Sequence, residues 1–300
     1  MNPLAEKIIK YVLPEFVQSR LRISQVSPYL KALRLSILDY YTNQPPGSLT
    51  DEHREVIGYL KKNPVSVFPY PFARTYRTKN IEVFKDEALG LRYVLLDGKK
   101  LYYKRSWSEQ KIAAMFNSVL KEQDELSPHR YLTESFKFNP GDIGADIGAA
   151  EGNFSLSVVE KAGKLFLFEK DPEWLEALQA TFAPWKDKVT IVSKYVSDKT
   201  NSCEVKLDEF YQDNINFIKI DVEGSELAVL RGTDAILQSN RHIKVALCTY
   251  HQQEDADVFK NIMEELGFKP EFSRGYMLFY YNRKIVAPFL RRGLIRATKN

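Results

Sequence analysis

The chain has 300 residues, of which 44% are apolar and 27% charged, a composition typical of globular proteins. Its formal net charge of +4 at pH 7 is mild and does not by itself indicate nucleic-acid binding, so we expect no nucleic-acid partner. No stretch is apolar for the roughly 18 residues that a membrane span needs, and charged residues interrupt the N-terminal apolar run, so we expect a cytoplasmic protein without a transmembrane segment or a secretory signal.

The first part of the chain predicts helices followed by a small β structure. Apolar residues at helical spacing predict helices over residues 4–60, interrupted by the prolines and glycine of 44–48. The proline-rich stretch 63–72 predicts an extended linker. Short β-branched and aromatic runs over 81–105 predict a small β meander. We expect residues 1–105 to shape an acceptor site or to form an oligomer contact, and a homo-oligomer is left open.

The order of elements changes after residue 105. A helix that begins at Ser106 or Ser108 comes first, and apolar strands then alternate with amphipathic helices. The expected strands are 142–147, 164–169, 188–193, 216–221 and 243–250, and the expected helices are 153–162, 172–182, 224–238 and 254–266. This alternation predicts an α/β fold, in which helices cover both faces of a mostly parallel sheet.

The C-terminal part breaks the alternation. Two strand-like runs, "FKPEF" and "YMLFYY", flank "SRG" and predict an antiparallel hairpin at the edge of the sheet. Residues 283–300 carry six basic residues and no acid, so we expect a basic tail outside the α/β domain of residues 106–282. This pattern allows either a peripheral contact with an anionic surface or a free solvated segment.

The stretch "DIGADIGAAEGNFSL", residues 142–156, joins the first strand of the sheet to a turn of small residues. Its glycines are spaced four apart, so the dinucleotide-binding pattern GxGxxG is absent. Asp146 and Glu151 place negative charge at the turn, which disfavours a pyrophosphate and favours a ligand with an ammonium group and a positive centre. We therefore expect S-adenosylmethionine as the cofactor. The turn residues expected to bind it are Asp146, Gly148, Ala149, Ala150, Glu151 and Gly152.

The second strand supports this assignment. "KLFLFEKDPEWLEAL" reaches its strand end at Glu169, where a carboxylate can accept hydrogen bonds from both ribose hydroxyls of a nucleoside. We therefore assign Glu169 and Lys170 to cofactor binding. The alternative for Asp146 and Glu169 is that both are solvated strand ends without a ligand.

The fourth strand, in "NFIKIDVEGSELAVLRG", ends at Asp221, and Glu223 follows shortly after. Both carboxylates can project into the crevice at the carboxyl ends of the strands. His251 follows the fifth strand, and its ordinary pKa of about 6.5 suits a base that takes a hydroxyl proton. We assign Asp221, Glu223 and His251 to catalysis and Asp221 also to cofactor binding. The alternative for His251 is a purely structural role.

Four stretches resemble the FkbM family of S-adenosylmethionine-dependent methyltransferases, over residues 120–282 approximately. They are "DIGAAEGNFS", "LFEKDPEWLEAL", "VKLDEF" and "IKIDVEGSELAVLRG". The resemblance implies a class I methyltransferase, Rossmann-like, with a seven-stranded, mostly parallel sheet. It also implies O-methylation of a small-molecule or glycan acceptor, with S-adenosylhomocysteine as the product of the cofactor. RNA or protein methylation, and a non-catalytic cofactor-binding subunit of polysaccharide assembly, are the alternatives.

The sequence leaves two further features of the site open. Asp221 and Glu223 offer oxygen ligands that suit Mg²⁺, but no third ligand can be named, and we expect no metal. Cys203 and Cys248 form no zinc or disulfide motif. The segment before the first strand, "LKEQDELSPHRYL", either contributes to the cofactor pocket or is a solvated helix end. Its candidate residues are Glu122, Asp124, His129, Arg130 and Tyr131.

Overall fold

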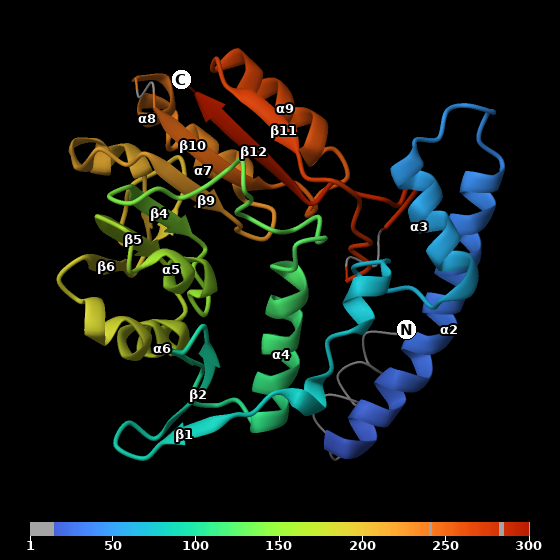
Figure 1. Cartoon of the computed structure of the whole chain (residues 1–300), viewed down its shortest axis with the longest axis horizontal. Coiled ribbons are helices and arrows are strands. Elements are labelled where there is room, and N and C mark those ends of the chain that lie inside the picture. The colour runs from blue at the N-terminus through green and yellow to red at the C-terminus, as the bar shows by residue number, and fades with distance from the viewer. Residues whose placement is uncertain (1–14, 240–241, 282–284, 300) are drawn as a thin grey trace.

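The computed structural model describes residues 15–239, 242–281 and 285–299. Its centre is a seven-stranded sheet with the strand order β11-β12-β10-β9-β4-β5-β6 (Figure 1). The strands are β4 (Ile143–Ile147), β5 (Lys164–Phe168), β6 (Val189–Val192), β9 (Phe217–Ile220), β10 (Ile243–Cys248), β11 (Lys269–Phe272) and β12 (Leu294–Lys299). β12 pairs antiparallel with β10 and β11, and the other pairs are parallel. The α/β fold with a seven-stranded, mostly parallel sheet is therefore confirmed.

The antiparallel pair at the edge of the sheet is not the hairpin that the sequence predicts. β11 pairs with β12, about twenty residues further along the chain than the predicted partner "YMLFYY". That predicted partner forms only an isolated bridge, between Met277 and Arg291. The reason is that its backbone bonds elsewhere: the amide of Tyr276 donates to the Tyr70 hydroxyl, and the amide of Leu278 donates to the Val67 carbonyl.

Helices cover both faces of the sheet, as its buried strands require (Figure 1). One face packs against α4 (Glu109–Glu122), α5 (Asn153–Val158) and α6 (Pro172–Phe182), and the other against α7 (Glu226–Arg231), α8 (Asp234–Ser239) and α9 (Asp255–Glu265). The predicted helix 224–238 is thus split into α7 and α8. Gly232 lies at the break, where an added Cβ would approach the Ser197 carbonyl oxygen to 1.9 Å.

Local sequence explains where two of the helices begin. Asp171 caps α6, because its side chain accepts hydrogen bonds from the amides of Glu173 and Trp174, and Pro172 occupies the first helical position. Ser108 caps α4 by accepting from the amide of Lys111. Both helix starts agree with the sequence prediction.

The N-terminal region contains two helices and a small antiparallel sheet. The helices α2 (Glu15–Thr42) and α3 (Asp51–Lys62) lie on the far side of α4 from the main sheet (Figure 1). Residues 4–14 of the predicted helical stretch lie outside the described residues. The predicted meander consists of β1 (Phe84–Asp86), β2 (Leu91–Leu96) and β3 (Lys99–Tyr102). It packs against α6, since the amide of Tyr102 donates to Thr181 Oγ1 at 3.0 Å.

The proline-rich stretch 63–72 is not a linker. Phe68, Tyr70 and Phe72 are buried, and Pro71–Arg74 forms a short 3₁₀ turn. These rings belong to the same apolar core as α4 and one face of the main sheet. The sequence prediction is wrong here because prolines limit backbone conformation without preventing the aromatic residues between them from packing.

The C-terminal stretch is likewise not a free basic tail over residues 285–299. Its end forms β12, which lies between β10 and β11 and pairs antiparallel with both. Several of its basic side chains bond to other parts of the described fold. Arg292 pairs with Glu52 at 2.8 Å, Arg296 donates to the carbonyls of Arg130 and Tyr131, and Lys299 donates to that of Leu237. The described helices include none that is long and apolar enough to span a bilayer.

Candidate active site

The candidate site lies at the carboxyl ends of β4, β5, β9 and β10. The sheet order places β4 between β5 and β9, so the chain leaves β4 in one direction and later returns on its other side. Ligands of open α/β sheets bind at this kind of reversal point. The acids predicted from three strand ends, Asp146, Glu169 and Asp221, are all at this edge of the sheet.

The turn after β4 has an unusual backbone. Gly148 and Gly152 have φ values of +76° and +86°, and Ala150 has a φ of +46°. A Cβ added at Gly148 would approach the Asp221 carbonyl oxygen to 2.0 Å, and the buried Ala149 donates its amide to Phe168. Gly148 is therefore required by close packing against the end of β9 and by its left-handed conformation.

Asp146 does not present a free carboxylate to the crevice. It is buried, its Oδ1 lies 3.1 Å from Lys219 Nζ, and its Oδ2 accepts from Ser155 Oγ at 2.7 Å. Lys219 Nζ also donates to the Gly148 carbonyl at 2.7 Å. Burial opposes the charge of Lys219, but Asp146 and Asp221 raise its pKa. Asp146 thus contacts an ammonium group of the protein itself and is linked to the turn through Lys219, while its predicted contact with the cofactor stays a prediction.

Glu169 lies where a ribose-binding acid is expected and also holds the turn. Its Oε2 accepts from the amide of Ala150 at 3.1 Å, while Oε1 accepts from the amides of Lys170 and Asp171 at 2.7 and 2.8 Å. Because each carboxylate oxygen has two lone pairs, Oε2 keeps one acceptor position for a ligand. Lys170 directs its Nζ toward the Ser193 carbonyl at 3.5 Å, away from the turn.

Glu151 is a buried acid within the turn. Burial raises its pKa to about 8, its own amide partly opposes this shift, and the nearby carboxyl group of Glu122 adds to it. No ion pair to Glu151 occurs among the described residues. A positively charged ligand beside a buried, unpaired carboxyl group lowers the pKa of that group, because the cation stabilises its ionised form. The resulting attraction favours binding of the ligand. The residues at the turn therefore fit a cofactor that carries positive charge, as S-adenosylmethionine does.

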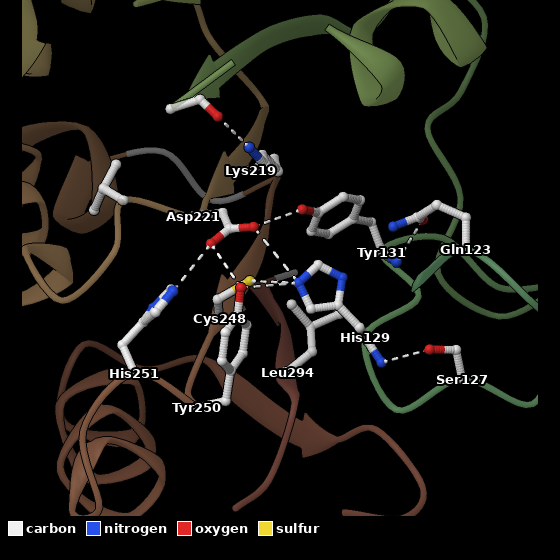
Figure 2. A network of polar contacts seen from close by, with 12 residues as sticks. Gln123, Ser127, His129, Tyr131, Lys219, Asp221, Cys248, Tyr250, His251 and Leu294 are labelled. Carbon is white, nitrogen blue, oxygen red and sulfur yellow. Dashed lines mark hydrogen bonds and ion pairs between the residues drawn. The ribbon is translucent and has the colours of Figure 1, made fainter. Parts of the chain in front are cut away.

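Asp221 is the centre of a polar network (Figure 2). Its Oδ2 accepts from the Tyr131 hydroxyl at 2.8 Å and lies 3.5 Å from His129 Nε2. Its Oδ1 lies 3.3 Å from the Tyr250 hydroxyl and 3.6 Å from His251 Nε2. Burial alone would raise the pKa of Asp221, but the contact with His129 and the charge of Lys219 hold that pKa well below its usual range. Asp221 therefore stays ionised and serves as a fixed negative charge.

His251 lies between two acids. Its Nδ1 is 2.8 Å from Glu226 Oε1 and its Nε2 faces Asp221. Burial opposes protonation, but the hydrogen bond to Glu226 and the charge of Asp221 raise the pKa of His251. Glu223, the acid that the sequence predicts beside Asp221, is exposed and has a φ of +54°. The acid that reaches His251 is Glu226, one helical turn further on.

The segment before β4, residues 120–132, contributes only some of its five candidate residues to the network around Asp221. His129 and Tyr131 contact Asp221, and Glu122 is close enough to affect its charge. Asp124 instead accepts from the Tyr76 hydroxyl at 2.6 Å, and Arg130 donates to the Leu132 carbonyl at 2.7 Å. The segment therefore lines the site with two of its residues rather than forming a solvated helix end.

Sequence reasoning missed Lys219, Glu226, Tyr250 and Arg291. The first two lie inside the quoted stretch "IKIDVEGSELAVLRG", where a lysine in an apolar strand and a glutamate at a helix start were available signals. Tyr250 precedes His251 and contacts both Asp221 and His129. Arg291 gave no local signal, yet its Nη1 donates to the carbonyls of Tyr250 and His251 at 2.8 and 2.7 Å. It fixes the loop that carries both rings.

Two groups of side chains around Asp221 have the donor atoms of a metal site. They are His129, Asp221 and Cys248, and Asp221, Glu226 and His251, each with its ligand atoms within 4.8 Å of one another. In the second group the two ring nitrogens of His251 face different carboxylates, so one ion could bind only one of these nitrogens. The expectation that no metal takes part stays a prediction.

Comparison with known proteins finds one family model that matches part of the chain. Residues 193–276 match the model of the methyltransferase FkbM domain, and no curated protein matches the chain. The chain is similar to a crystal structure of methyltransferase FkbM from Methylobacillus flagellatus, at 19% identity and a TM-score of 0.45, over 65% of this chain and 56% of that one. This chain therefore spans just over half the length of that relative.

Two other solved structures are similar at lower identity. One is a tRNA methyltransferase from M. jannaschii, at 13% identity and a TM-score of 0.43, over 70% of this chain and 57% of that one. The other is a precorrin methyltransferase from Geobacter metallireducens, at 15% identity and a TM-score of 0.39, over 54% of this chain and 84% of that one.

Proposed function

We propose that the chain transfers a methyl group from S-adenosylmethionine to a hydroxyl group of a sugar or glycan-like small molecule. The match of residues 193–276 to the methyltransferase FkbM domain supports this, because two of the four resembling motifs lie in that stretch. The observation that carries the proposal is the placement of His251 between Glu226 and Asp221 at the carboxyl ends of the strands. An alcohol must lose its proton when it gains a methyl group, and this histidine is placed to accept one.

The contact with Glu226 determines which nitrogen of His251 is available. Glu226 Oε1 accepts from the amide of Val222 at 3.1 Å and lies 2.8 Å from His251 Nδ1. Of the two ring nitrogens, Nδ1 lies closer to a carboxyl oxygen, 2.8 Å against 3.6 Å for Nε2. We therefore place the hydrogen of the neutral imidazole on Nδ1 and the lone pair on Nε2. Nε2 then takes the hydroxyl proton, and Asp221 stabilises the imidazolium that forms.

The other residues of the site bind and orient. The bound cofactor supplies the electrophilic methyl group on a positively charged sulfur. In this proposal the free acceptor position of Glu169 binds its nucleoside, and Glu151 and Asp221 provide negative charge for its cationic groups. The Tyr131 hydroxyl donates to Asp221 Oδ2 at 2.8 Å and so helps to hold that carboxylate in position.

The proposal is tested in two steps. Calorimetric titration of the wild type and of Glu169→Ala with S-adenosylhomocysteine tests whether the chain binds the cofactor. We expect the wild type to bind with micromolar affinity and Glu169→Ala to bind at least about tenfold more weakly. Incubation with S-adenosylmethionine and a panel of sugars then measures the acceptor half, by release of S-adenosylhomocysteine and by mass gain of the sugar. Binding of a dinucleotide instead of S-adenosylhomocysteine would refute the proposal. Binding of S-adenosylhomocysteine without transfer to any sugar would refute the acceptor half and favour RNA or protein methylation or a non-catalytic subunit.

A further inference from the structure

A cavity of about 230 Å³ adjoins the acid–base network. Its walls come from the N-terminal region, from α4 and from residues 277–281, so it lies where the first part of the chain meets the methyltransferase sheet. Its volume is below the roughly 300–1,000 Å³ of sites that hold drug-sized ligands, so it suits a single small ring. The aromatic side chains that line it are Tyr59, Phe68, Tyr250, Phe279, Tyr280 and Tyr281.

The cavity and the network share a wall. Tyr250 lines the cavity, and its hydroxyl lies 3.3 Å from Asp221 Oδ1. Phe279 also lines it and packs on the rings of Tyr250 and His251, with centroid distances of 5.1 and 5.6 Å. A molecule in this cavity therefore contacts Tyr250 and Phe279, whose rings pack on His251, the side chain that we propose takes the hydroxyl proton.

Two cations line the same cavity, and no acidic side chain of the described residues forms an ion pair with either. Lys121 is half-buried, and burial lowers its pKa without a compensating charge. Arg74 donates to Asn63 Oδ1 at 2.5 Å, which fixes one side of its guanidinium and leaves other donors free. Partial burial of a charged lysine without an acidic partner costs free energy, and an anionic ligand bound beside the lysine offsets this cost.

Glu122 is the acidic residue on the cavity wall, and it weighs against an anion if it is charged. Burial raises its pKa, although the charge of His129 opposes this shift. The raised pKa reduces the cost of placing an anion beside this group, and a carboxyl group in either protonation state can hydrogen-bond to a ligand hydroxyl. The cavity therefore combines aromatic faces, two unpaired cations and a hydroxyl partner.

We propose that this cavity is the acceptor site and that it takes a sugar ring carrying an anionic group. Lys121 and Arg74 bind the carboxylate or phosphate, and the tyrosine and phenylalanine rings pack on the apolar face of the sugar. The anion at one end directs the opposite end of the ring, with its hydroxyls, toward Tyr250 and His251. This inference rests on the proposed function and adds a substrate class to it.

The test measures acceptor binding without methyl transfer. The full-length protein is first titrated with S-adenosylhomocysteine, and the saturated protein is then titrated with methyl glucuronide, a glucose phosphate and the neutral methyl glucoside. We expect at least one of the two anionic sugars to bind about ten times more tightly than the neutral one. Lys121→Met and Arg74→Gln should each remove most of this preference. Lys121→Arg should keep it, and so should Lys111→Met, an exposed lysine on the same helix.

The outcomes separate the two proposals. Absence of S-adenosylhomocysteine binding would refute the proposed function itself. If S-adenosylhomocysteine binds normally, the proposed function stands, and the sugar titrations test the acceptor inference alone. Three results would overturn that inference: equal affinity for neutral and charged sugars, no sugar binding, or a preference for charged sugars that survives both Lys121→Met and Arg74→Gln. A preference for the glucuronide or for the phosphate alone identifies which anion the site recognises.

Discussion

His251 Nδ1 lies 2.8 Å from Glu226 Oε1, and both side chains are almost completely buried. Glu226 begins helix α7, whereas His251 follows strand β10. The contact therefore joins the ends of two elements that come together only when the chain folds. The pair fixes the orientation of the imidazole and raises its pKa. If His251 is the base, activity should increase with pH through that raised pKa, as the neutral imidazole forms.

Glu226→Gln should lower the maximal rate of methyl transfer by about 10- to 100-fold. It should also move the acidic limb of the pH–rate profile to lower pH, because His251 loses the hydrogen bond that raises its pKa. Glu223→Gln is the control, since Glu223 is exposed and raises the pKa of His251 less than Glu226 does. A larger effect of Glu223→Gln would restore the role that the sequence predicts for that residue.

Glu151→Gln should change how stability depends on pH. The folded pKa of Glu151, about 8, lies above its ordinary value, so the folded state binds the proton more tightly than the unfolded state. The stability contributed by this group is complete below its unfolded pKa and is lost as pH rises toward the folded value. Glu151→Gln should therefore stabilise the protein near about pH 9 by a few kcal/mol and change it little near about pH 5.

Urea unfolding of the wild type and Glu151→Gln at the two pH values measures this difference. Glu82→Gln, at an exposed glutamate, is the control and should leave the pH dependence unchanged. Parallel pH profiles for wild type and Glu151→Gln would contradict the prediction.

Lys219→Met should destabilise the fold by about 3–5 kcal/mol, because Asp146 would remain as a buried charge without its partner. Adding Asp146→Asn to Lys219→Met should recover part of this loss. Chemical denaturation of the two single variants and the double variant gives the coupling energy. Strictly additive losses would show that the two side chains do not act as a pair.

Gly148→Ala tests the close approach between the turn and β9. Gly98 has nearly the same φ, +77° against +76°, but a Cβ there would meet no atom within 4 Å. Both substitutions carry the strain of a left-handed backbone, and only Gly148→Ala adds a clash with the Asp221 carbonyl. We expect Gly148→Ala to cost at least about 2 kcal/mol more in unfolding free energy than Gly98→Ala and to abolish S-adenosylhomocysteine binding. Equal losses in the two variants would disprove the role of the clash.

Removal of metal ions tests the prediction that none takes part. Dialysis against EDTA should leave the rate of methyl transfer unchanged, because Glu226, 2.8 Å from His251 Nδ1, can stabilise the charge of that ring without an ion. Loss of activity that Mg²⁺, Mn²⁺ or Zn²⁺ restores would assign a metal to one of the two groups around Asp221.

The pattern of apolar strands and helices was sufficient to predict the main sheet, because period and capping are local properties. The predicted helix 172–182 has the observed bounds, and its start depends only on Asp171 and Pro172. The hairpin prediction failed because strand pairing is not local: β11 could pair with either of two later segments. The backbone of 276–281 bonds to residues 67–70, which lie about two hundred positions earlier.

The sequence by itself determined the α/β architecture, the acid-led turn and the set of charged residues at the strand ends. These follow from hydrophobic period, from glycine at positions of positive φ and from the charge that a ligand must complement. Only the tertiary structure decided which charges meet. Lys219 meets Asp146, and Glu226 rather than Glu223 meets His251, whereas Lys121 and Arg74 meet no acidic side chain among the described residues. The physical reason is that charge interactions and burial depend on distances through space, and strand ends adjacent in the sheet can be a hundred residues apart in the chain.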